Sequence, residues 1–347
     1  MDNSAPSYSA QNLQESVTQR LYTRAVAKGE VTLPAVPAMI DEYLAMCDTL
    51  FASVGRKFSA EELGQVRTAL QDQLAVAYAA SPRSTIRISY HTPLGSTLHY
   101  EVNAQWWTRE SAYQSLLSTR EPPLLATEPD ARVCALVNEV PDPTTHWVLD
   151  IGAGTGRNTL ALARRGHPVD VVEQAPQFAE MIRAEAERES LQVRVIVRDI
   201  FSPADDLRRD YRLIVASEVV SDLRTTEQLR GLYELAASCL APGANFVFNV
   251  FLARRGFVPD QAVREFGQQM STSIFTWDEI LAAAADLPLE LVADDSVYDY
   301  EKEHLPQGDW PPTAWYPQWV SGLDLFPVER AASPIEMSWL VYQKIGW

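Results

Sequence analysis

Residues 147–173 (WVLDIGAGTGRNTLALARRGHPVDVVE) contain a glycine loop between two apolar runs, and this order restricts the fold more than any other part of the chain. The first apolar run, 147–151, ends at Gly152, and a helical pattern follows the loop. The second run, 169–172, ends at Glu173. The pattern predicts a β-loop-α-β unit with a ligand crevice at the carboxyl ends of its parallel strands.

The glycine spacing narrows the kind of ligand. Gly152 and Gly154 let the backbone approach a ligand closely because they carry no side chain. The next helix begins near Gly156, so its free N–H groups and positive dipole end face that ligand. Glu173 follows Gly152 by 21 residues, where a carboxylate can accept both hydroxyls of a ribose. The spacing is G-x-G-x-G rather than the G-x-G-x-x-G of dinucleotide sites, so an NAD(P)-dependent oxidoreductase is the less favoured alternative.

Asp150 precedes the loop, and the run from Asp150 to Asn158 resembles the first motif, D-x-G-x-G-x-G, of class I S-adenosylmethionine-dependent methyltransferases, in particular their small-molecule branch. The resemblance covers about residues 126–347 and is densest in 147–251. Within this range a helical pattern covers 130–140, and apolar runs predict further strands over 193–197, 211–216 and 245–251. It implies an α/β fold with a Rossmann-like seven-stranded sheet and the cofactor S-adenosyl-L-methionine, with S-adenosyl-L-homocysteine as product. A cofactor-binding scaffold without turnover is the non-enzymatic alternative.

The resemblance also implies which residues hold the cofactor. The glycine loop lies under the methionine moiety and ribose, and Glu173 binds the ribose hydroxyls. Asp199 accepts from the adenine amino group, although loop capping stays open as its alternative role. The implied cofactor-binding residues are Asp150, Gly152, Ala153, Gly154, Gly156, Asn158, Glu173, Gln174, Asp199, Ile200 and Ser217.

The acceptor class follows from motif and charge. Ser217-Glu218-Val219-Val220 stands where enzymes methylating base or glutamine amines carry a [DNS]-P-P-[YFW] run, and the chain has no Pro-Cys dipeptide. A formal charge of −17 also disfavours binding to nucleic-acid phosphates. We therefore expect a small-molecule acceptor, methylated on oxygen or nitrogen because these acceptors are commoner than carbon.

The sequence offers fewer candidates for catalysis and substrate binding than for cofactor binding. A general base is needed only if the acceptor must lose its proton early, and Glu218 and His91 are the leading candidates, with Asp222 and His99 behind them. Aromatic side chains in 309–319 and after residue 105 suit an apolar or cationic acceptor, although packing against the sheet edge is an equal alternative. The predicted substrate-binding residues are Trp106, Trp107, Trp315, Tyr316 and Trp319.

The first 125 residues differ from the rest. Helical patterns cover 11–28, 38–54 and 59–78, and two alternating runs, 85–90 and 97–102, predict a β-hairpin. We expect a helical extension with a hairpin that covers the active site or builds a homodimer, joined to a methyltransferase domain over 126–347.

The sequence also gives expectations for the cellular location of the protein and for the role of its cysteines. It shows neither a signal peptide nor the ~18 consecutive apolar residues of a membrane span, so we expect a cytoplasmic protein without a membrane partner. The three cysteines lie far apart in apolar stretches, which indicates buried hydrophobes rather than metal ligands, and no metal site is expected.

Overall fold

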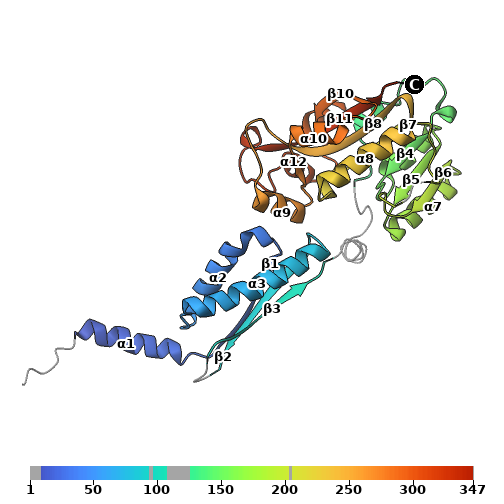
Figure 1. Cartoon of the computed structure of the whole chain (residues 1–347). Helices are drawn as coiled ribbons and strands as arrows, with labels where there is room; N and C mark the ends of the chain where they lie inside the picture. The colour runs from blue at the N-terminus through green and yellow to red at the C-terminus, as the bar shows by residue number, and fades with distance from the viewer. Residues whose placement is uncertain (1–8, 94–96, 108–125, 203–204, 347) are drawn as a thin grey trace, which may run out of the picture. The chain divides into compact units, whose positions relative to one another are not determined.

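The computed structural model describes residues 9–93, 97–107, 126–202 and 205–346. The chain forms two compact units, Met1–Arg109 and Glu110–Trp347, which Figure 1 shows and which are described separately below. The predicted division between 125 and 126 adjoins residues outside the described ranges and stays a prediction.

The first unit is a three-stranded antiparallel sheet, in the order β1-β2-β3, with helices packed against it. The predicted hairpin is confirmed as β2 and β3, in which Ile88 pairs with Val102; its predicted turn includes residues 94–96, which lie outside the described ranges. The elements are α1 (Ala10–Thr23), β1 (Ala27–Pro34), η1 (Pro37–Met39), α2 (Ile40–Ser53), α3 (Ala60–Ala80), β2 (Thr85–Thr92) and β3 (His99–Gln105).

Strand β1 corrects the helix predicted over 11–28. Helix α1 ends at Thr23, and Ala27 to Pro34 pair along the full length of β2. Alternate residues of β1 are exposed, which is the period of a half-buried strand, so pairing with β2 overrides the helical pattern.

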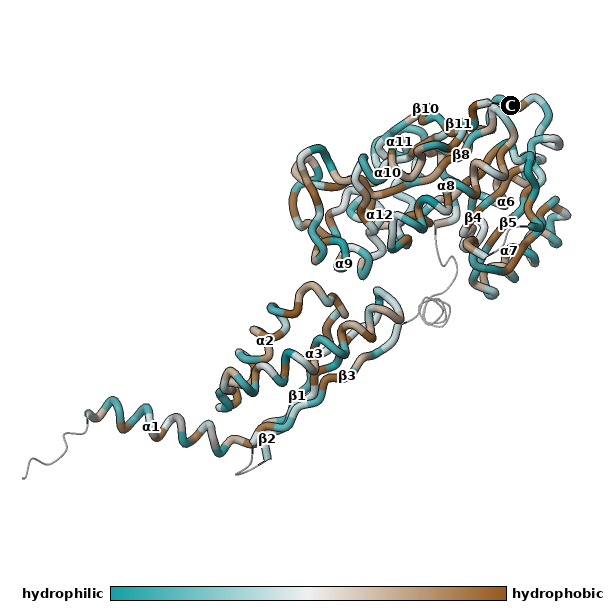
Figure 2. The backbone as a smooth tube through the Cα atoms, viewed as in Figure 1, coloured by the Kyte–Doolittle hydropathy of each residue, from teal (hydrophilic) through white to brown (hydrophobic). Residues whose placement is uncertain are grey.

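Helices α2 and α3 cover the sheet through Phe51, Leu70 and Leu74, all fully buried. The predicted capping box at Ser59 opens α3: the Glu62 N–H donates to Ser59 Oγ and the Ser59 N–H to Glu62 Oε2. Helix α1 differs, because its apolar stripe of Leu13, Val17 and Leu21 is at least half exposed; Figure 2 shows brown and teal positions alternating along it.

The second unit is a mostly parallel sheet with helices on its faces, which confirms the predicted fold class. Its strand order is β10-β11-β8-β7-β4-β5-β6, with the two-residue β9 added beside β8. Strand β11 runs antiparallel to both neighbours, whereas β4 to β8 are parallel. The order reverses between β4 and β7, which places a ligand crevice at the carboxyl ends of these two strands.

Most strand predictions hold within a few residues. Strand β8 is longer than the predicted 245–251 because its pairing begins at Leu240, and α5 is shorter than the predicted 130–140. The strands are β4 (Val148–Ile151), β5 (Val169–Glu173), β6 (Val193–Val197), β7 (Tyr211–Ala216), β8 (Leu240–Ala253), β9 (Ile274–Phe275), β10 (Leu289–Ser296) and β11 (Ile335–Lys344). The helices are α5 (Ala131–Ala135), η2 (Pro143–Thr145), α6 (Arg157–Arg164), α7 (Pro176–Arg188), η3 (Val220–Asp222), α8 (Thr226–Cys239), α9 (Gln261–Gln269), α10 (Trp277–Ala284), α11 (Val297–His304), α12 (Tyr316–Val320) and η4 (Arg330–Ala332).

Two apolar clusters, one on each face of the sheet, form the core of this unit. One contains Tyr233 of α8 against Phe246 and Phe248 of β8. The other contains Trp339 of β11 and Trp319 of α12. Within the described ranges, no helix combines the length and apolar character that a membrane crossing requires.

Candidate active site

The glycine loop leaves the carboxyl end of β4 in a left-handed backbone conformation. The φ angles of Gly152, Gly154 and Gly156 are +66°, +56° and +90°. A Cβ on Gly152 would lie 2.7 Å from Val219 Cγ2, so the loop also approaches the turn after β7 too closely for a side chain. The motif therefore forms a backbone cradle rather than an ordinary turn.

Glu173, at the end of β5, holds the cradle in place. Its carboxylate is 3% exposed and accepts from the N–H of Gly154 at 2.9 Å and the N–H of Ala175 at 2.7 Å. These contacts place a carboxylate at the end of β5 directly beside the glycine loop, the position at which such a group can accept from ribose hydroxyls in sites of this kind.

Asp150 lies beneath the loop and is 2% exposed. Its Oδ2 accepts from Thr159 Oγ1 at 2.5 Å. Burial raises the pKa of Asp150 to about 7, against the opposing effects of the Thr159 hydrogen bond and the Arg157 charge. Asp150 therefore supports the start of α6 from below the loop.

Arg157, the first residue of α6, joins three acidic or polar groups above the loop. Its guanidinium donates to Asp130 Oδ1, to Ser217 Oγ at 3.1 Å and to Glu218 Oε1 at 2.8 Å. Burial alone would lower the pKa of Arg157, but Asp130 and Glu218 raise it above its usual value. A permanently charged arginine thus lies between two carboxylates at the carboxyl ends of β4 and β7.

Asp130 is the hub of this cluster. Its Oδ2 accepts from Ser217 Oγ at 2.7 Å and from Asn158 Nδ2 at 2.8 Å, while its backbone N–H donates to Asn158 Oδ1 at 2.9 Å. The Asn158 side chain is therefore fully engaged with Asp130. In this arrangement, Asn158 and Ser217 hold the carboxylate that holds Arg157.

Glu218 follows β7 and points its carboxylate into the same cluster. It has a φ of +60°, rare for a residue with a side chain, and its N–H donates to Asn249 Oδ1 at 2.6 Å. Burial raises the pKa of Glu218 despite the Arg157 charge. Asn249 Nδ2 and Ser273 Oγ are buried and have no partner within the described ranges, which is the usual sign of an absent ligand or water.

The remaining predicted cofactor residues lie around the cradle. The Ala153 carbonyl accepts from the Gly156 N–H at 2.9 Å, and Gln174 is exposed. Asp199 is exposed, and its Oδ1 accepts from the Phe201 N–H at 2.9 Å, which is the loop-capping arrangement. Ile200 packs partly buried against the core.

The predicted aromatic segment divides into different environments. Trp319 is 7% exposed, packs on Phe251 with ring centroids 5.5 Å apart, and donates from Nε1 to the Ser271 carbonyl. Trp315 is 43% exposed. Tyr316 is 2% exposed, and burial, together with the charges of Asp130 and Glu218, raises its pKa well above the usual value. Tyr316 is therefore the side chain of this segment whose pKa is affected by the carboxylates bound to Arg157.

Three predicted site residues belong to the first unit. His91 stacks on His99 with ring centroids 5.0 Å apart. Trp106 and Trp107 are 61% and 44% exposed beside Arg83. Their roles in catalysis and acceptor binding stay predictions.

Sequence reasoning missed Arg157 and Asp130. Arg157 stood inside the motif, but nothing in the sequence shows that its partners lie 27 and 61 residues away. Within the described ranges, no group of at least three His, Cys, Asp or Glu side chains is arranged to hold a metal ion.

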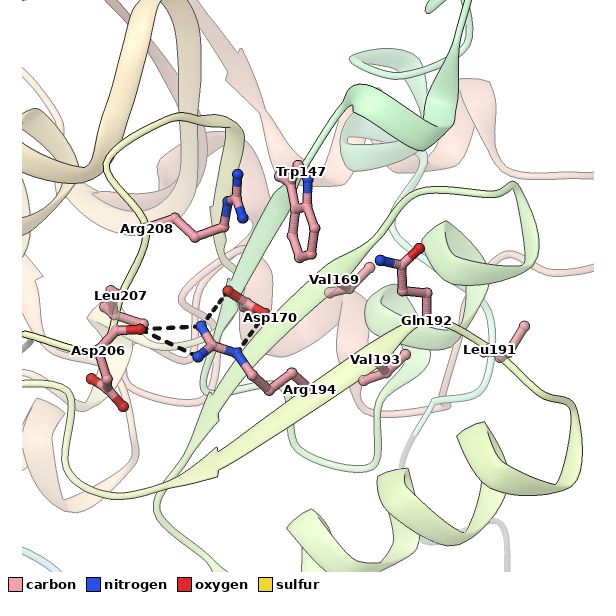
Figure 3. A pocket seen from close by; sticks show the side chains of 10 residues that line it. All are labelled: Trp147, Val169, Asp170, Leu191, Gln192, Val193, Arg194, Asp206, Leu207 and Arg208. Atoms are coloured by element: carbon pink, nitrogen blue, oxygen red, sulfur yellow. Dashed lines mark hydrogen bonds and ion pairs between the residues drawn. The ribbon is translucent and has the colours of Figure 1, made fainter.

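A second pocket lies at the opposite, amino ends of the strands (Figure 3). Arg194 of β6 donates to both oxygens of Asp170 on β5, at 2.9 and 2.6 Å, and Tyr211 donates to the same carboxylate. The Arg208 guanidinium lies 4.0 Å from the centre of the Trp147 ring.

The sequence between β4 and the start of β8 is similar to that of a known domain. Residues 148–243 match the family model of a methyltransferase domain, and they contain the cradle, Glu173, Arg157 and Glu218. This part of the chain is therefore similar to methyltransferase domains. No curated protein matches the chain in sequence.

Solved methyltransferases share the chain path of this domain at a distance. Geranyl diphosphate C-methyltransferase from Streptomyces coelicolor A3(2), in a complex with Mg²⁺, geranyl diphosphate and S-adenosyl-L-homocysteine, is 15% identical with a TM-score of 0.47, over 62% of this chain and 79% of that one. A geranyl diphosphate methyltransferase with GPP and sinefungin is 16% identical with a TM-score of 0.49, over 62% and 78%. StiE O-MT, residues 961–1257, is 16% identical with a TM-score of 0.43, over 69% and 78%. These similarities are too distant to inform on the acceptor.

Proposed function

We propose that the methyltransferase domain transfers a methyl group from S-adenosylmethionine to an oxygen or nitrogen atom of a small-molecule acceptor. One observation carries the proposal. The glycine cradle, Glu173 and the Arg157–Glu218 pair converge at the carboxyl ends of the adjacent strands β4, β5 and β7.

The residues present fit the cofactor. Glu173 would accept from the ribose hydroxyls, because its carboxylate lies beside the glycine loop at the end of β5. Arg157, whose guanidinium lies 2.8 Å from the Glu218 carboxylate, would bind the carboxylate of the methionine moiety. When bound, the cofactor supplies an electrophilic methyl group on a sulfonium.

Glu218 is our choice for the general base. Its carboxylate is part of the cluster, its side chain is 32% exposed, and its raised pKa brings it nearer to the operating pH of a base. It would take the proton from the O–H or N–H of the acceptor. Tyr316, whose pKa is raised well above its usual value, stays neutral and would donate a hydrogen bond.

The charge of the crevice supports a small acceptor over a nucleic acid. Two carboxylates, Asp130 and Glu218, surround the single Arg157, and the whole chain carries −17. Phosphate backbones require clustered cations instead. A neutral or cationic metabolite meets no such repulsion.

Calorimetry with S-adenosyl-L-homocysteine tests the cofactor part. Glu173→Ala should weaken binding by about 2 kcal/mol, the scale of lost charge-assisted hydrogen bonds, and Gly154→Val should abolish it because a β-branched residue is strained at a φ of +56°. Glu180→Ala, on the exposed side of α7, is the matched control and should bind normally. Wild-type protein that binds no S-adenosyl-L-homocysteine would refute the proposal.

The acceptor part requires turnover. Wild-type protein with S-adenosylmethionine should methylate at least one member of a panel of small phenols, carboxylic acids and amines, and Glu218→Gln should slow that turnover at least a hundredfold, within the usual range for a general base. Methylation at carbon alone would correct the proposed acceptor atom.

A further inference from the structure

The amino end of helix α5 is capped by a carboxylate from a distant part of the chain and not by the side chain of its own N-cap residue. Asp130 occupies the N-cap position, with extended backbone angles (φ −63°, ψ 129°), but its side chain makes no capping hydrogen bond. Aspartate is among the residues preferred at that position because it can accept from the second or third N–H group of the helix. In this protein the N–H groups of Ala131 and Arg132, the first two of α5, donate to another residue.

This residue is Glu301 of α11, which follows Ala131 by 170 residues in the chain. Its Oε2 accepts from the Ala131 N–H at 2.8 Å, and its Oε1 accepts from the Arg132 N–H at 3.2 Å and from Trp339 Nε1 at 2.9 Å. Glu301 is 1% exposed. One buried carboxylate thus ties α5, α11 and β11 together.

Because Glu301 caps α5 in place of Asp130 (the cap exchange), the Asp130 carboxylate can bind other partners. It accepts from Arg157, Asn158 and Ser217 at the carboxyl ends of β4 and β7. Asp130 directs both carboxylate oxygens to these partners rather than to the N–H groups of α5. The Arg132 N–H, at the second position of α5, is a donor that an N-cap side chain normally uses, and Glu301 accepts from it instead.

We propose that Glu301 is a positioning residue of the active site: by capping α5 in place of Asp130, it holds the Asp130 carboxylate on Arg157 and so orients the Arg157–Glu218 pair. This inference rests on the proposed function for its effect on the cofactor, whereas the cap exchange itself does not. Without Glu301, Asp130 returns to cap its own helix and Arg157 loses its buried partner.

The first test is a double-mutant cycle on cofactor binding. E301A should weaken S-adenosyl-L-homocysteine binding at least fivefold. In a D130A background the same change should have no further effect, because Glu301 acts through Asp130. E303A, an exposed glutamate of the same helix, is the control and should leave affinity unchanged. Equal effects of E301A in both backgrounds, or none in either, would overturn the inference.

The second test measures stability by urea unfolding of the cofactor-free full chain. On stability, in contrast to binding, E301A should have the larger effect in the D130A background. It should lower the unfolding midpoint more in that background than in the wild type, since α5 then has no cap at all. Additive shifts would overturn the cap exchange. If E301A does not fold, E301Q serves, because its amide keeps one acceptor oxygen but cannot accept all three N–H groups.

The outcomes separate the two proposals. Wild-type protein that binds no S-adenosyl-L-homocysteine contradicts the proposed function, while the unfolding cycle still decides the cap exchange. Wild-type protein that binds normally, together with an E301A variant that also binds normally, contradicts only the positioning role.

Discussion

The two ends of the parallel sheet each contain a buried aspartate paired with an arginine, but the pairs differ in what surrounds them. At the amino end, Asp170 accepts from Arg194 (Figure 3). It also accepts from the Tyr211 hydroxyl. At the carboxyl end, Arg157 is shared between Asp130 and Glu218. There, Asn249 Nδ2 and Ser273 Oγ remain buried without partners within the described ranges.

The difference separates a structural ion pair from a binding site. The amino-end carboxylate has its partners within the protein, so it contributes mainly to the folded state. The carboxyl-end cluster has one more carboxylate than it has arginines and lies beside the glycine cradle, so its charges are placed to bind a ligand. Each prediction below tests whether this division holds.

The largest effect concerns Asp150, which has a hydroxyl rather than an arginine as its hydrogen-bond partner. Burial raises its pKa in the folded state from 3.8 to about 7, so the folded protein binds this proton more tightly than the unfolded chain. The resulting stability is fully present below about pH 4 and is lost as the pH rises to 7, by as much as ~4 kcal/mol. Asp150→Asn should lack this loss in urea unfolding at pH 5 and pH 8, and parallel pH profiles of the two proteins would contradict the assignment.

Breaking the amino-end pair should cost stability alone. Asp170→Ala leaves the buried Tyr211 hydroxyl without its acceptor, whereas Arg194 is 49% exposed and can be hydrated. It should lower the free energy of unfolding by about 2 kcal/mol, with S-adenosyl-L-homocysteine affinity unchanged in the folded fraction. Asp210→Ala, which removes an exposed partner of Arg208, should change stability by less than about 0.5 kcal/mol. A loss of cofactor affinity in Asp170→Ala would mean that the two ends are coupled.

A matched pair of arginine substitutions compares the two ends directly. Arg157→Lys keeps the charge but loses the planar fork that reaches Asp130, Ser217 and Glu218. It should weaken S-adenosyl-L-homocysteine binding about thirtyfold, or ~2 kcal/mol. Arg194→Lys should leave calorimetric affinity unchanged, and equal losses in both variants would remove the distinction.

The smallest effect separates packing from acceptor binding within the aromatic segment. Trp315, 43% exposed, should lower turnover about tenfold (~1.4 kcal/mol) when replaced by alanine, without a change in cofactor affinity. Trp319→Ala should instead lower the melting temperature, because its ring packs on Phe251. Normal kinetics in Trp315→Ala would assign that ring to the surface.

The features that the sequence predicted are those encoded locally. Strands such as 193–197 and 211–216 were found at their observed bounds, because short runs rich in Val and Ile mark strands in a sequence. The glycine loop and Glu173 were found because their spacing is short and specific.

The features it did not predict depend on distant contacts. The Glu301 cap joins residues 170 positions apart, and the Ser217 contact with Asp130 spans 87. Strand β1 was missed because its pairing with β2, across Ala27 and Thr92, outweighs a local helical pattern. No periodicity in a single sequence shows which distant carboxylate occupies a given helix end.

The left-handed backbone of Glu218 sets the stability of the folded protein against its proposed catalytic role. A residue with a Cβ at a φ of +60° costs roughly 1 kcal/mol relative to glycine. Glycine at this position would relieve that strain, but it would also remove the proposed base and one of the two carboxylate partners of Arg157. The strained backbone at position 218 is therefore a cost in stability that accompanies the placement of a carboxylate in the site.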